Sequence, residues 1–288
     1  MTKGFGWKML LFLAVVILTS CRCSHCKMGE EPTAVKDSFK VENLETQRKV
    51  EGTVKWSTMQ RVGYPVIPDS IPSMLLERYC YTVSYNGRTR QPNWVMWQLD
   101  GDHVMKRKEG MWSDYRPDMT LADTIRATLE DYAGSGYDRG HMCPGGDCNW
   151  DSIGRDETFV LSNMCPQHPE LNRGDWKEIE NACRRWAQKY GTVYIVCGPM
   201  FFKSEKHKEI GPNHIPVPEA FFKVVVCADS STPRGIGFIC RNTEGNRKKD
   251  FYVNSIRQVE RITGYKFFPT LQDSIKDKVF DRDSISDW

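Results

Sequence analysis

A short stretch of the chain carries polar side chains with which a protein can cleave a phosphodiester. The segment Asp138-Arg139-Gly140-His141 is followed by a polar cluster that begins at Asn163, and then by Asn172 and Glu180. His141 can accept a proton near neutral pH, because the free pKa of imidazole lies there. A histidine, two amides, an arginine and a carboxylate can together build a hydrolytic site around one metal ion.

Asn172 and Glu180 are the candidates for holding Mg²⁺. This ion prefers oxygen ligands and keeps most of its waters, so the neutral side-chain oxygen of Asn172 suits it. On one regular helix the two residues would lie about 12 Å apart along the axis, too far to share a small ion. We therefore expect Asn172 to bind the ion directly and Glu180 to act through a water molecule. The competing interpretation of Glu180 is an ion pair with Arg184, four residues later.

Arg139 is a candidate for binding phosphate. Its planar guanidinium matches two phosphate oxygens, and the neighbouring Gly140 permits close approach of the backbone to a ligand. The competing interpretation is that Asp138 and Arg139 pair with each other on a surface turn. Asn163 likewise has a plain alternative, which is to cap the turn before Pro166.

The segments that must position these residues alternate irregularly between strand and helix patterns. Apolar spacings of three and four predict one helix through Trp176, with Trp176 in the core, and another that ends at Gly264. This irregular order indicates an α+β fold rather than a regularly alternating parallel one. The expected strands are 78–85, 93–99, 158–162, 192–197 (central), 220–227 and 235–240, and the second helix is expected at 250–263.

The first twenty residues are typical of a secretory signal. Two lysines precede an apolar run from Met9 to Leu18, which is shorter than the roughly 20 residues of a membrane span. The ending Thr19-Ser20-Cys21 resembles a bacterial lipoprotein signal, in which Cys21 becomes the lipidated first residue. The alternative is cleavage nearby and a freely secreted protein. We therefore predict export to the periplasm or the outer membrane of a Gram-negative bacterium, or secretion.

Three regions follow from this pattern: a signal at 1–20, a linker or tether at 21–68 and one globular domain at 69–288. Without residues 1–20 the formal net charge falls from +3 to +1, because two lysines are lost. A nearly neutral protein has no global field that attracts nucleic acid, so phosphate binding would depend on local groups. Basic runs of the kind that usually form solvated surface occur at 106–108, 184–185 and 247–249.

Eleven cysteines are present, and an exported chain can keep disulfides. Spacing does not fix their pairing, although the turn between Cys143 and Cys148 could let these two pair. The Cys23-Ser24-His25-Cys26 sequence lacks the second pair of ligands that a zinc site needs, so we interpret it as part of the tether.

Together the motifs resemble those of the DNA/RNA non-specific endonuclease family, which includes endonuclease G. Asp-Arg-Gly-His stands at 138–141, Ser-Asn-x-x-Pro-Gln at 162–167 and Asn-x-x-x-Trp-x-x-x-Glu at 172–180. Several motifs in the right order are far more specific than any one of them. The resemblance extends over residues 79–268, with further similar segments at 93–95, 197–199, 215–218, 221–223, 263–264 and 267–269.

This resemblance implies a ββα-metal (His-Me finger) fold, with a central mixed or antiparallel sheet flanked by helices. It implies His141 as general base and Asn172 as the ligand of Mg²⁺, for which Mn²⁺ can substitute. Supporting roles fall to Asp138, Arg139, Asn163 and Glu180. A further upstream arginine would contact phosphate; Arg116 is the best match and Arg107 is the alternative. Cys143 stands where the family would have alanine.

The function that the resemblance implies is an exported, metal-dependent endonuclease that cuts DNA and RNA and leaves 5′-phosphate ends. No protein partner is evident from the sequence, and the only expected membrane contact is the lipid on Cys21. Two alternatives stay open. One is a catalytically silent lipoprotein that binds nucleic acid, and the other is a phosphodiesterase that acts on smaller substrates.

Overall fold

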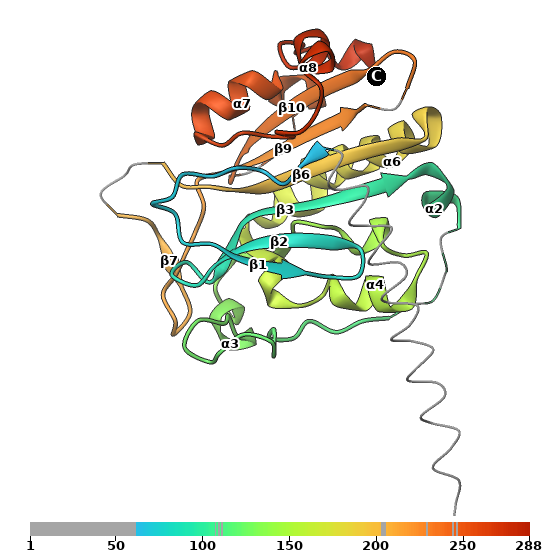
Figure 1. Ribbon diagram of the computed structural model, residues 1–288. Coiled ribbons are helices and arrows are strands. Elements are labelled where there is room, and N and C mark those ends of the chain that lie inside the picture. The colour runs from blue at the N-terminus through green and yellow to red at the C-terminus, as the bar shows by residue number, and fades with distance from the viewer. Residues whose placement is uncertain are drawn as a thin grey trace, which may run out of the picture. The chain divides into compact units, whose positions relative to one another are not determined.

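A seven-stranded antiparallel sheet forms the centre of the fold, with the strand order β1-β2-β3-β6-β9-β10-β11 (Figure 1). The α+β class is confirmed, and β6, whose apolar run predicted a central strand, is the fourth of the seven. The strands are β1 (Met74–Glu77), β2 (Tyr81–Asn86), β3 (Gln91–Asp100), β6 (Thr192–Met200), β9 (Ala220–Cys227), β10 (Arg234–Arg241) and β11 (Val253–Asn254).

The computed structural model describes residues 62–106, 108, 110, 112–202, 206–228, 230–243, 245 and 247–288. The signal expected at 1–20, the lipidation expected at Cys21, most of the expected linker and Arg107 lie outside these residues. Among the residues described, no helix is both long and apolar enough to cross a membrane.

Both faces of the sheet are covered. Successive side chains along a strand point to opposite faces, and this alternation decides which of two cores each side chain joins. In β3, Val95 and Trp97 belong to one core, while Trp94 and Met96 belong to the other. The first core is closed by α6 (Lys177–Tyr190). The second is closed by α7 (Ile256–Thr263) and α8 (Asp273–Val279), which lie beside β10 in Figure 1. Coverage of both faces explains the near-continuous apolar runs of the central strands.

The motif residues of the sequence lie on a ββα unit against the first core. β4 (Asp138–His141) pairs antiparallel with β5 (Met164–Gln167). The chain continues through α5 (Pro169–Leu171) and the π-helical turn η3 (Asn172–Trp176) into α6. The remaining elements are α2 (Gly101–Met105), α3 (Leu129–Tyr132), η1 (Gly145–Asp147), α4 (Ser152–Glu157), η2 (Leu161–Asn163), β7 (Glu209–Ile210), β8 (Ile215–Pro216), η4 (Lys249–Tyr252) and η5 (Ile285–Asp287).

Two expected elements differ from the structure. The strand predicted at 158–162 is wrong: Val160 makes only an isolated bridge, and Leu161–Asn163 form a 3₁₀ turn. The reason is that the side chain of Asn163 donates to the carbonyl of Thr158 and so competes with strand pairing. The helix predicted from 250 begins only at Ile256, after β11 has paired with β10. Its predicted end is confirmed, because Gly264 caps it with a φ of +73°.

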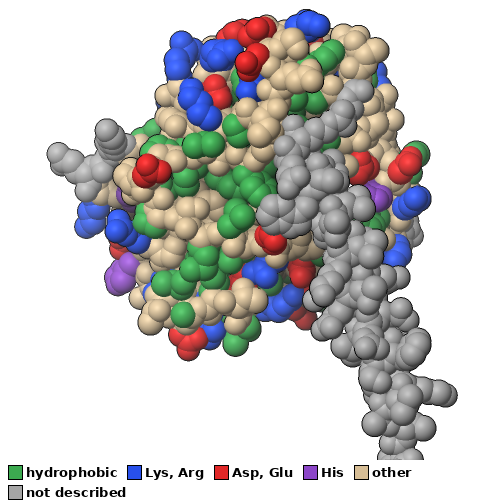
Figure 2. Space-filling view, in the orientation of Figure 1, with side chains coloured by type: hydrophobic (Ala, Val, Ile, Leu, Met, Phe, Trp, Pro, Cys, Tyr) green, Lys and Arg blue, Asp and Glu red, His purple; other side chains and the backbone are tan. Residues whose placement is uncertain are grey.

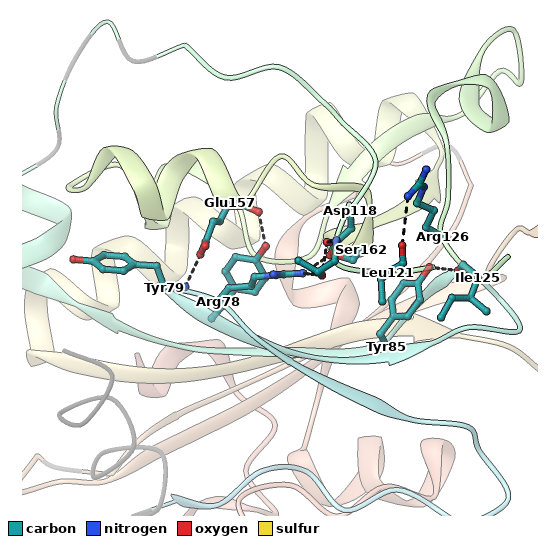
Figure 3. A network of polar contacts seen from close by, with 11 residues as sticks. Arg78, Tyr79, Tyr85, Asp118, Leu121, Ile125, Arg126, Glu157 and Ser162 are labelled. Atoms are coloured by element: carbon teal, nitrogen blue, oxygen red, sulfur yellow. Dashed lines mark hydrogen bonds and ion pairs between the residues drawn. The ribbon is translucent and has the colours of Figure 1, made fainter. Parts of the chain in front are cut away.

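A buried polar network fastens the loop that precedes the ββα unit (Figure 3). Asp118 accepts hydrogen bonds from Arg78 and from the hydroxyls of Thr120 and Ser162. Although burial opposes ionisation, these hydrogen bonds and the charge of Arg78 lower the pKa of Asp118. The Tyr85 hydroxyl donates to the carbonyl of Ile125 at 2.7 Å and fixes the same loop further along. The loop therefore approaches the site from a fixed position.

The edge strand β1 presents apolar side chains to the surface. Met74 and Leu75 are each 45% exposed, whereas all six residues of the neighbouring β2 are buried. In the space-filling view, hydrophobic side chains gather over this part of the sheet (Figure 2). The short edge strand thus shields β2, which contributes Tyr81, Val83 and Tyr85 to the core.

Replacement of Ser255 by alanine tests how α7 begins. The Ser255 hydroxyl accepts from Gln258 N at 3.1 Å, and Gln258 Oε1 accepts from Ser255 N at 2.7 Å, which is a complete capping box. We expect Ser255→Ala to lower the free energy of urea unfolding by about 1 kcal/mol. Ser255→Thr, which keeps the hydroxyl, is the control. An equal loss in both variants would mean that side-chain volume matters here and the cap does not.

Candidate active site

His141 lies at the end of β4, where it pairs with Met164 of β5. Its Nε2 atom is buried and has no hydrogen-bond partner among the residues that the structure describes. Phe159 packs edge-on against the imidazole with ring centroids 4.8 Å apart, and Tyr115 lies at 5.5 Å. The His141 carbonyl accepts a hydrogen bond from Trp176 Nε1 at 3.3 Å. Packing thus holds the ring and leaves one nitrogen open to a further partner.

The surroundings of His141 favour its neutral form. Burial lowers the pKa of the imidazole to about 3, and the nearby charge of Arg155 acts in the same direction. A neutral imidazole can accept a proton, whereas an imidazolium cannot. The structure therefore provides a histidine in the protonation state that a general base requires.

Asp138 ties β4 to the start of the helical segment. Its Oδ2 accepts a hydrogen bond of 2.9 Å from Asn172 Nδ2, and Arg173 donates to both carboxylate oxygens at 2.8 and 2.6 Å. Although burial opposes ionisation, these bonds, together with the charge of Arg139, lower the pKa of Asp138. The alternative in which Asp138 and Arg139 pair on a surface turn does not describe this arrangement, since Asp138 bonds to Arg173 and Asn172.

The contact with Asp138 decides which way the Asn172 amide points. An ionised carboxylate only accepts hydrogen bonds, so the amide must turn its NH₂ group toward Asp138 and its Oδ1 away. Among the described residues, no protein donor reaches that Oδ1 atom. A neutral oxygen held in one orientation is a suitable donor for a hard cation such as Mg²⁺.

Arg139 contacts the ring of Tyr115, and Arg116 follows Tyr115 directly in the chain. The Arg139 guanidinium lies over the Tyr115 ring, 4.4 Å from its centroid. Arg116, the best upstream match for a phosphate contact, donates to Asp156 at 2.5 and 3.2 Å, and both side chains are well exposed. A phosphate could reach Arg116 only in competition with Asp156.

Asn163 holds the backbone that follows His141. Its Oδ1 accepts from Cys143 N at 2.9 Å, and its Nδ2 donates to the carbonyls of Cys143 and Thr158 at 2.8 Å each. The residue is fully buried. These contacts replace the simple turn cap that the sequence also allowed and place Asn163 behind the site, where it fixes the chain.

Glu180 belongs to a buried group of four charges. Arg184 NH2 lies 3.6 Å from Glu180 Oε2, and Arg184 Nε donates to Asp147 at 2.6 Å. The pair with Arg184 that the sequence allowed is present, but its side chains are only 11% and 16% exposed, so it is no surface pair. Burial raises the pKa of Glu180, against the opposing charges of Lys223 and Arg184. Because its ion pair with Arg184 is long, Glu180 keeps oxygen lone pairs that can accept hydrogen bonds from water.

Lys223 is the fourth charge of this group and is fully buried in β9. Its Nζ lies 4.2 Å from the centroid of the Trp176 ring and 5.6 Å from that of Trp97. Although burial opposes the charged form, Cys197 and Glu180 raise the pKa of Lys223. A buried ammonium without a hydrogen-bonded carboxylate is costly, so the electrostatic attraction to Glu180 and the ring faces offsets that cost.

Gly140 allows β4 to approach β5 closely. A Cβ atom at this position would lie 2.3 Å from Gln167 Oε1 and 2.5 Å from Gln167 Cβ. Gln167 is fully buried, and neither atom of its amide has a partner in the described part of the chain. The glycine of the Asp-Arg-Gly-His motif is therefore required by packing between the two strands.

The donor set fits a hydrated Mg²⁺ ion better than a metal held by many side chains. The described residues contain no group of three or more histidine, cysteine, aspartate or glutamate side chains that could hold a metal. Mg²⁺ accepts a set of this kind, in which the oriented amide oxygen of Asn172 binds the ion and the Glu180 carboxylate accepts hydrogen bonds from its waters.

Comparison with known proteins agrees with this geometry. The profile of the DNA/RNA non-specific endonuclease family matches residues 59–274. The chain belongs to this family.

Relatives in the family come from distant organisms. Human mitochondrial endonuclease G is 36% identical over 210 residues, which cover 69% of this chain and 71% of that protein. A nuclease of Nostoc is 34% identical and covers 71% of this chain and 78% of its own length. Human mitochondrial nuclease EXOG is 30% identical over 78% of this chain, which spans only 64% of the length of that relative.

A solved structure shares the fold of this family member. The crystal structure of the EndoG/EndoGI complex superimposes with a TM-score of 0.71 at 27% identity, over 80% of this chain and 97% of that one. The antiparallel sheet and the ββα unit are therefore those of an endonuclease G fold, as the motifs predicted.

The structure adds residues to the site that the sequence did not single out: Tyr115, Asp147, Arg173 and Lys223. The signal for Lys223 was present, because it is the only charged residue in the apolar strand Ala220–Cys227. No signal marked Tyr115, since its contact with His141 joins residues 26 positions apart through tertiary packing.

The acid stability of the protein tests the burial of His141. Its pKa is lower in the folded state than in the unfolded chain, so the unfolded chain binds the proton first and stability falls as pH drops from about 6.5 toward 3. Between pH 7 and pH 5 we expect the wild type to lose roughly 2 kcal/mol more than His141→Asn. Urea unfolding at both pH values measures this difference, and an identical pH response of the two proteins would refute it.

Proposed function

We propose that this protein is a metal-dependent endonuclease that hydrolyses phosphodiester bonds in DNA and RNA. The observation that carries the proposal is the neutral His141, whose buried Nε2 has no hydrogen-bond partner among the described residues, on the same ββα unit as an Asn172 amide oriented by Asp138. A nuclease name is shared by the relatives, including human endonuclease G and the Nostoc nuclease. Family membership supports the same reaction class here.

In the proposed reaction, His141 Nε2 takes a proton from a water molecule that attacks phosphorus in line. The hydrophobic contacts of the imidazole with Phe159 and Tyr115 keep its position while the proton moves. Arg139, held on the Tyr115 ring, lies beside the histidine in β4 and can stabilise the charge that develops on the phosphate oxygens. Arg116 can add a second contact if it exchanges Asp156 for phosphate.

Asn172 would hold Mg²⁺, and Glu180 would orient waters around it. The ion, when bound, supplies positive charge that stabilises the departing 3′ oxygen, and Mn²⁺ could replace it. Asp138 keeps the Asn172 oxygen turned away from its own carboxylate, and the charges of Lys223 and Arg184 oppose the rise that burial causes in the pKa of Glu180. Departure of the 3′ oxygen gives 5′-phosphate ends. Contacts that go to phosphate, not to bases, imply cleavage of both DNA and RNA with little sequence preference.

Location and partners complete the proposal. The signal-like residues 1–20 and Cys21 support export, with a lipid anchor or secretion as the two forms. The structural neighbour is a complex titled for inhibition of EndoG by EndoGI. A protein inhibitor is therefore a class of partner worth testing for this chain as well, although its sequence gave no sign of one.

Two substitutions test the roles of base and ligand. We expect His141→Ala and Asn172→Ala to reduce cleavage of supercoiled plasmid and of RNA by at least about a hundredfold, as loss of a general base or a sole metal ligand does. EDTA should abolish cleavage by the wild type. His214→Ala is the matched control, because that histidine is 78% exposed and pairs with Glu209 outside the ββα unit. Cleavage by His141→Ala at the wild-type rate would rule out His141 as the general base.

A third substitution tests the orientation of the Asn172 amide. In Asp138→Asn the partner side chain can donate as well as accept, so Asn172 is no longer held with its oxygen outward. We expect the affinity for Mg²⁺ or Mn²⁺ to fall by about 10-fold or more, measured by calorimetry and by the metal dependence of cleavage. Asp281→Asn, which loses an exposed pair with Arg257, is the control. Unchanged metal affinity in Asp138→Asn would show that the contact does not orient the ligand.

A further inference from the structure

A basic segment, Arg247–Phe251, lies next to the candidate active site. Arg247 and Lys248 are exposed, Lys249 is partly exposed, and the Phe251 side chain is 69% exposed. None of the three cations forms an ion pair with another described residue. A run of cations ordinarily forms solvated surface, but an exposed phenylalanine among them is an unusual addition.

A buried carboxylate anchors the basic segment at both of its ends. Asp175 Oδ2 accepts a hydrogen bond from Arg247 N at 3.0 Å and one from the Tyr252 hydroxyl. A Cβ atom on Gly245 would lie 2.7 Å from the same oxygen, so the chain passes close to Asp175. Asp175 follows Asn172 by three residues within η3. The residue that anchors the segment is therefore only three positions along the chain from the candidate metal ligand.

The chain just before the basic segment is fixed to the strand pair of the site. Asn242 Oδ1 accepts from His168 N at 2.8 Å, and Asn242 Nδ2 donates to the carbonyls of Pro166 and Pro218 at 3.0 and 2.8 Å. Pro166 lies in β5, opposite Arg139 of β4. The segment and the chain that precedes it are thus fixed to the elements that carry the proposed catalytic groups.

The chemistry of the segment suits a nucleic-acid strand. The Arg247 guanidinium lies 5.3 Å from the centroid of the Phe251 ring, which pairs a cation with an exposed aromatic face. Exposed aromatic rings stack on bases, and neighbouring cations bind the phosphates between them. Phosphates of one strand recur about every 3.4 Å along the duplex axis, so a strand whose scissile phosphate lies at His141 extends its flanking phosphates over the surface around the site. Asp250, which is also exposed, offsets only one of the three positive charges, so the segment keeps a net positive charge.

We propose that Arg247, Lys248, Lys249 and Phe251 form an accessory binding surface for the strand that flanks the scissile phosphate. The three cations bind phosphates, and Phe251 stacks on one base. This inference rests on the proposed nuclease function. It makes affinity for long strands depend on residues that a small phosphodiester never touches.

The test compares two substrates cleaved by the full chain carrying Arg247→Gln, Lys248→Gln and Lys249→Gln. For a 20-nucleotide single strand we expect KM to rise by about 10-fold or more near 0.1 M salt, and the slope of log affinity against log salt to fall by about 2. For bis(p-nitrophenyl) phosphate the rate should stay the same, which also shows that the variant folds. A matched triple variant neutralises Arg261, Lys266 and Lys278, which lie around α7 and α8 against the second core.

Phe251→Ala tests the stacking contact separately. Binding of the same 20-nucleotide strand is measured by fluorescence anisotropy in a His141→Ala background, where no cleavage interferes. We expect affinity to fall by at least about fivefold, which is the lower range for loss of one base–aromatic contact. Phe202→Ala is the control, because that ring is also exposed, at 44%, and precedes β9 outside the basic segment.

The outcomes separate this inference from the proposed function. If KM and the salt slope of the triple variant equal those of the wild type, or change as much in the control triple, the accessory surface is refuted. If the wild type cuts neither substrate, the nuclease proposal fails. The anisotropy measurement then still decides the inference, because unchanged binding in both the triple variant and Phe251→Ala would refute it.

Discussion

The carboxylate of Asp138 is the contact on which the arrangement of the site depends. It joins β4, which carries Arg139 and His141, to the helical turn that begins at Asn172. Without this contact, β4 and the helical turn would be joined by apolar packing and by the hydrogen bond from Trp176 Nε1 to the His141 carbonyl, and neither of these fixes the orientation of the Asn172 amide. Arg173 neutralises the same carboxylate from the solvent side, so the anion can stay ionised at the edge of the site.

Near the site, the protein buries a group of four charged side chains in its core. Glu180, Arg184, Asp147 and Lys223 balance one another in sign, and their side chains are between fully and largely buried. Replacing such a group by apolar residues often stabilises a protein, so its presence indicates a use other than stability. The use consistent with the proposed reaction is to keep Glu180 in a long, loose ion pair with Arg184, while the nearby cations oppose the rise that burial causes in the pKa of Glu180.

The aromatic rings next to His141 favour its neutral form. A histidine that accepts a proton must be neutral, and the rings of Phe159 and Tyr115 exclude the water that would stabilise its cation. The ring face of Tyr115 also contacts Arg139, so one residue positions both the proposed base and the proposed phosphate-binding group. Asn163 completes the frame by holding the backbone of Cys143 from behind.

The sequence by itself determined the fold class, the central strand and the set of chemical groups, because alternation and helical spacing are local patterns and the motifs are contiguous. It placed the helix through Trp176 correctly and failed at 158–162, where the Asn163 side chain takes up a backbone carbonyl. Only the tertiary structure decided what each group touches. Asp138 bonds to Asn172 and Arg173, and Lys223 lies under Trp176, because sheet register and core packing bring together residues that no spacing rule connects.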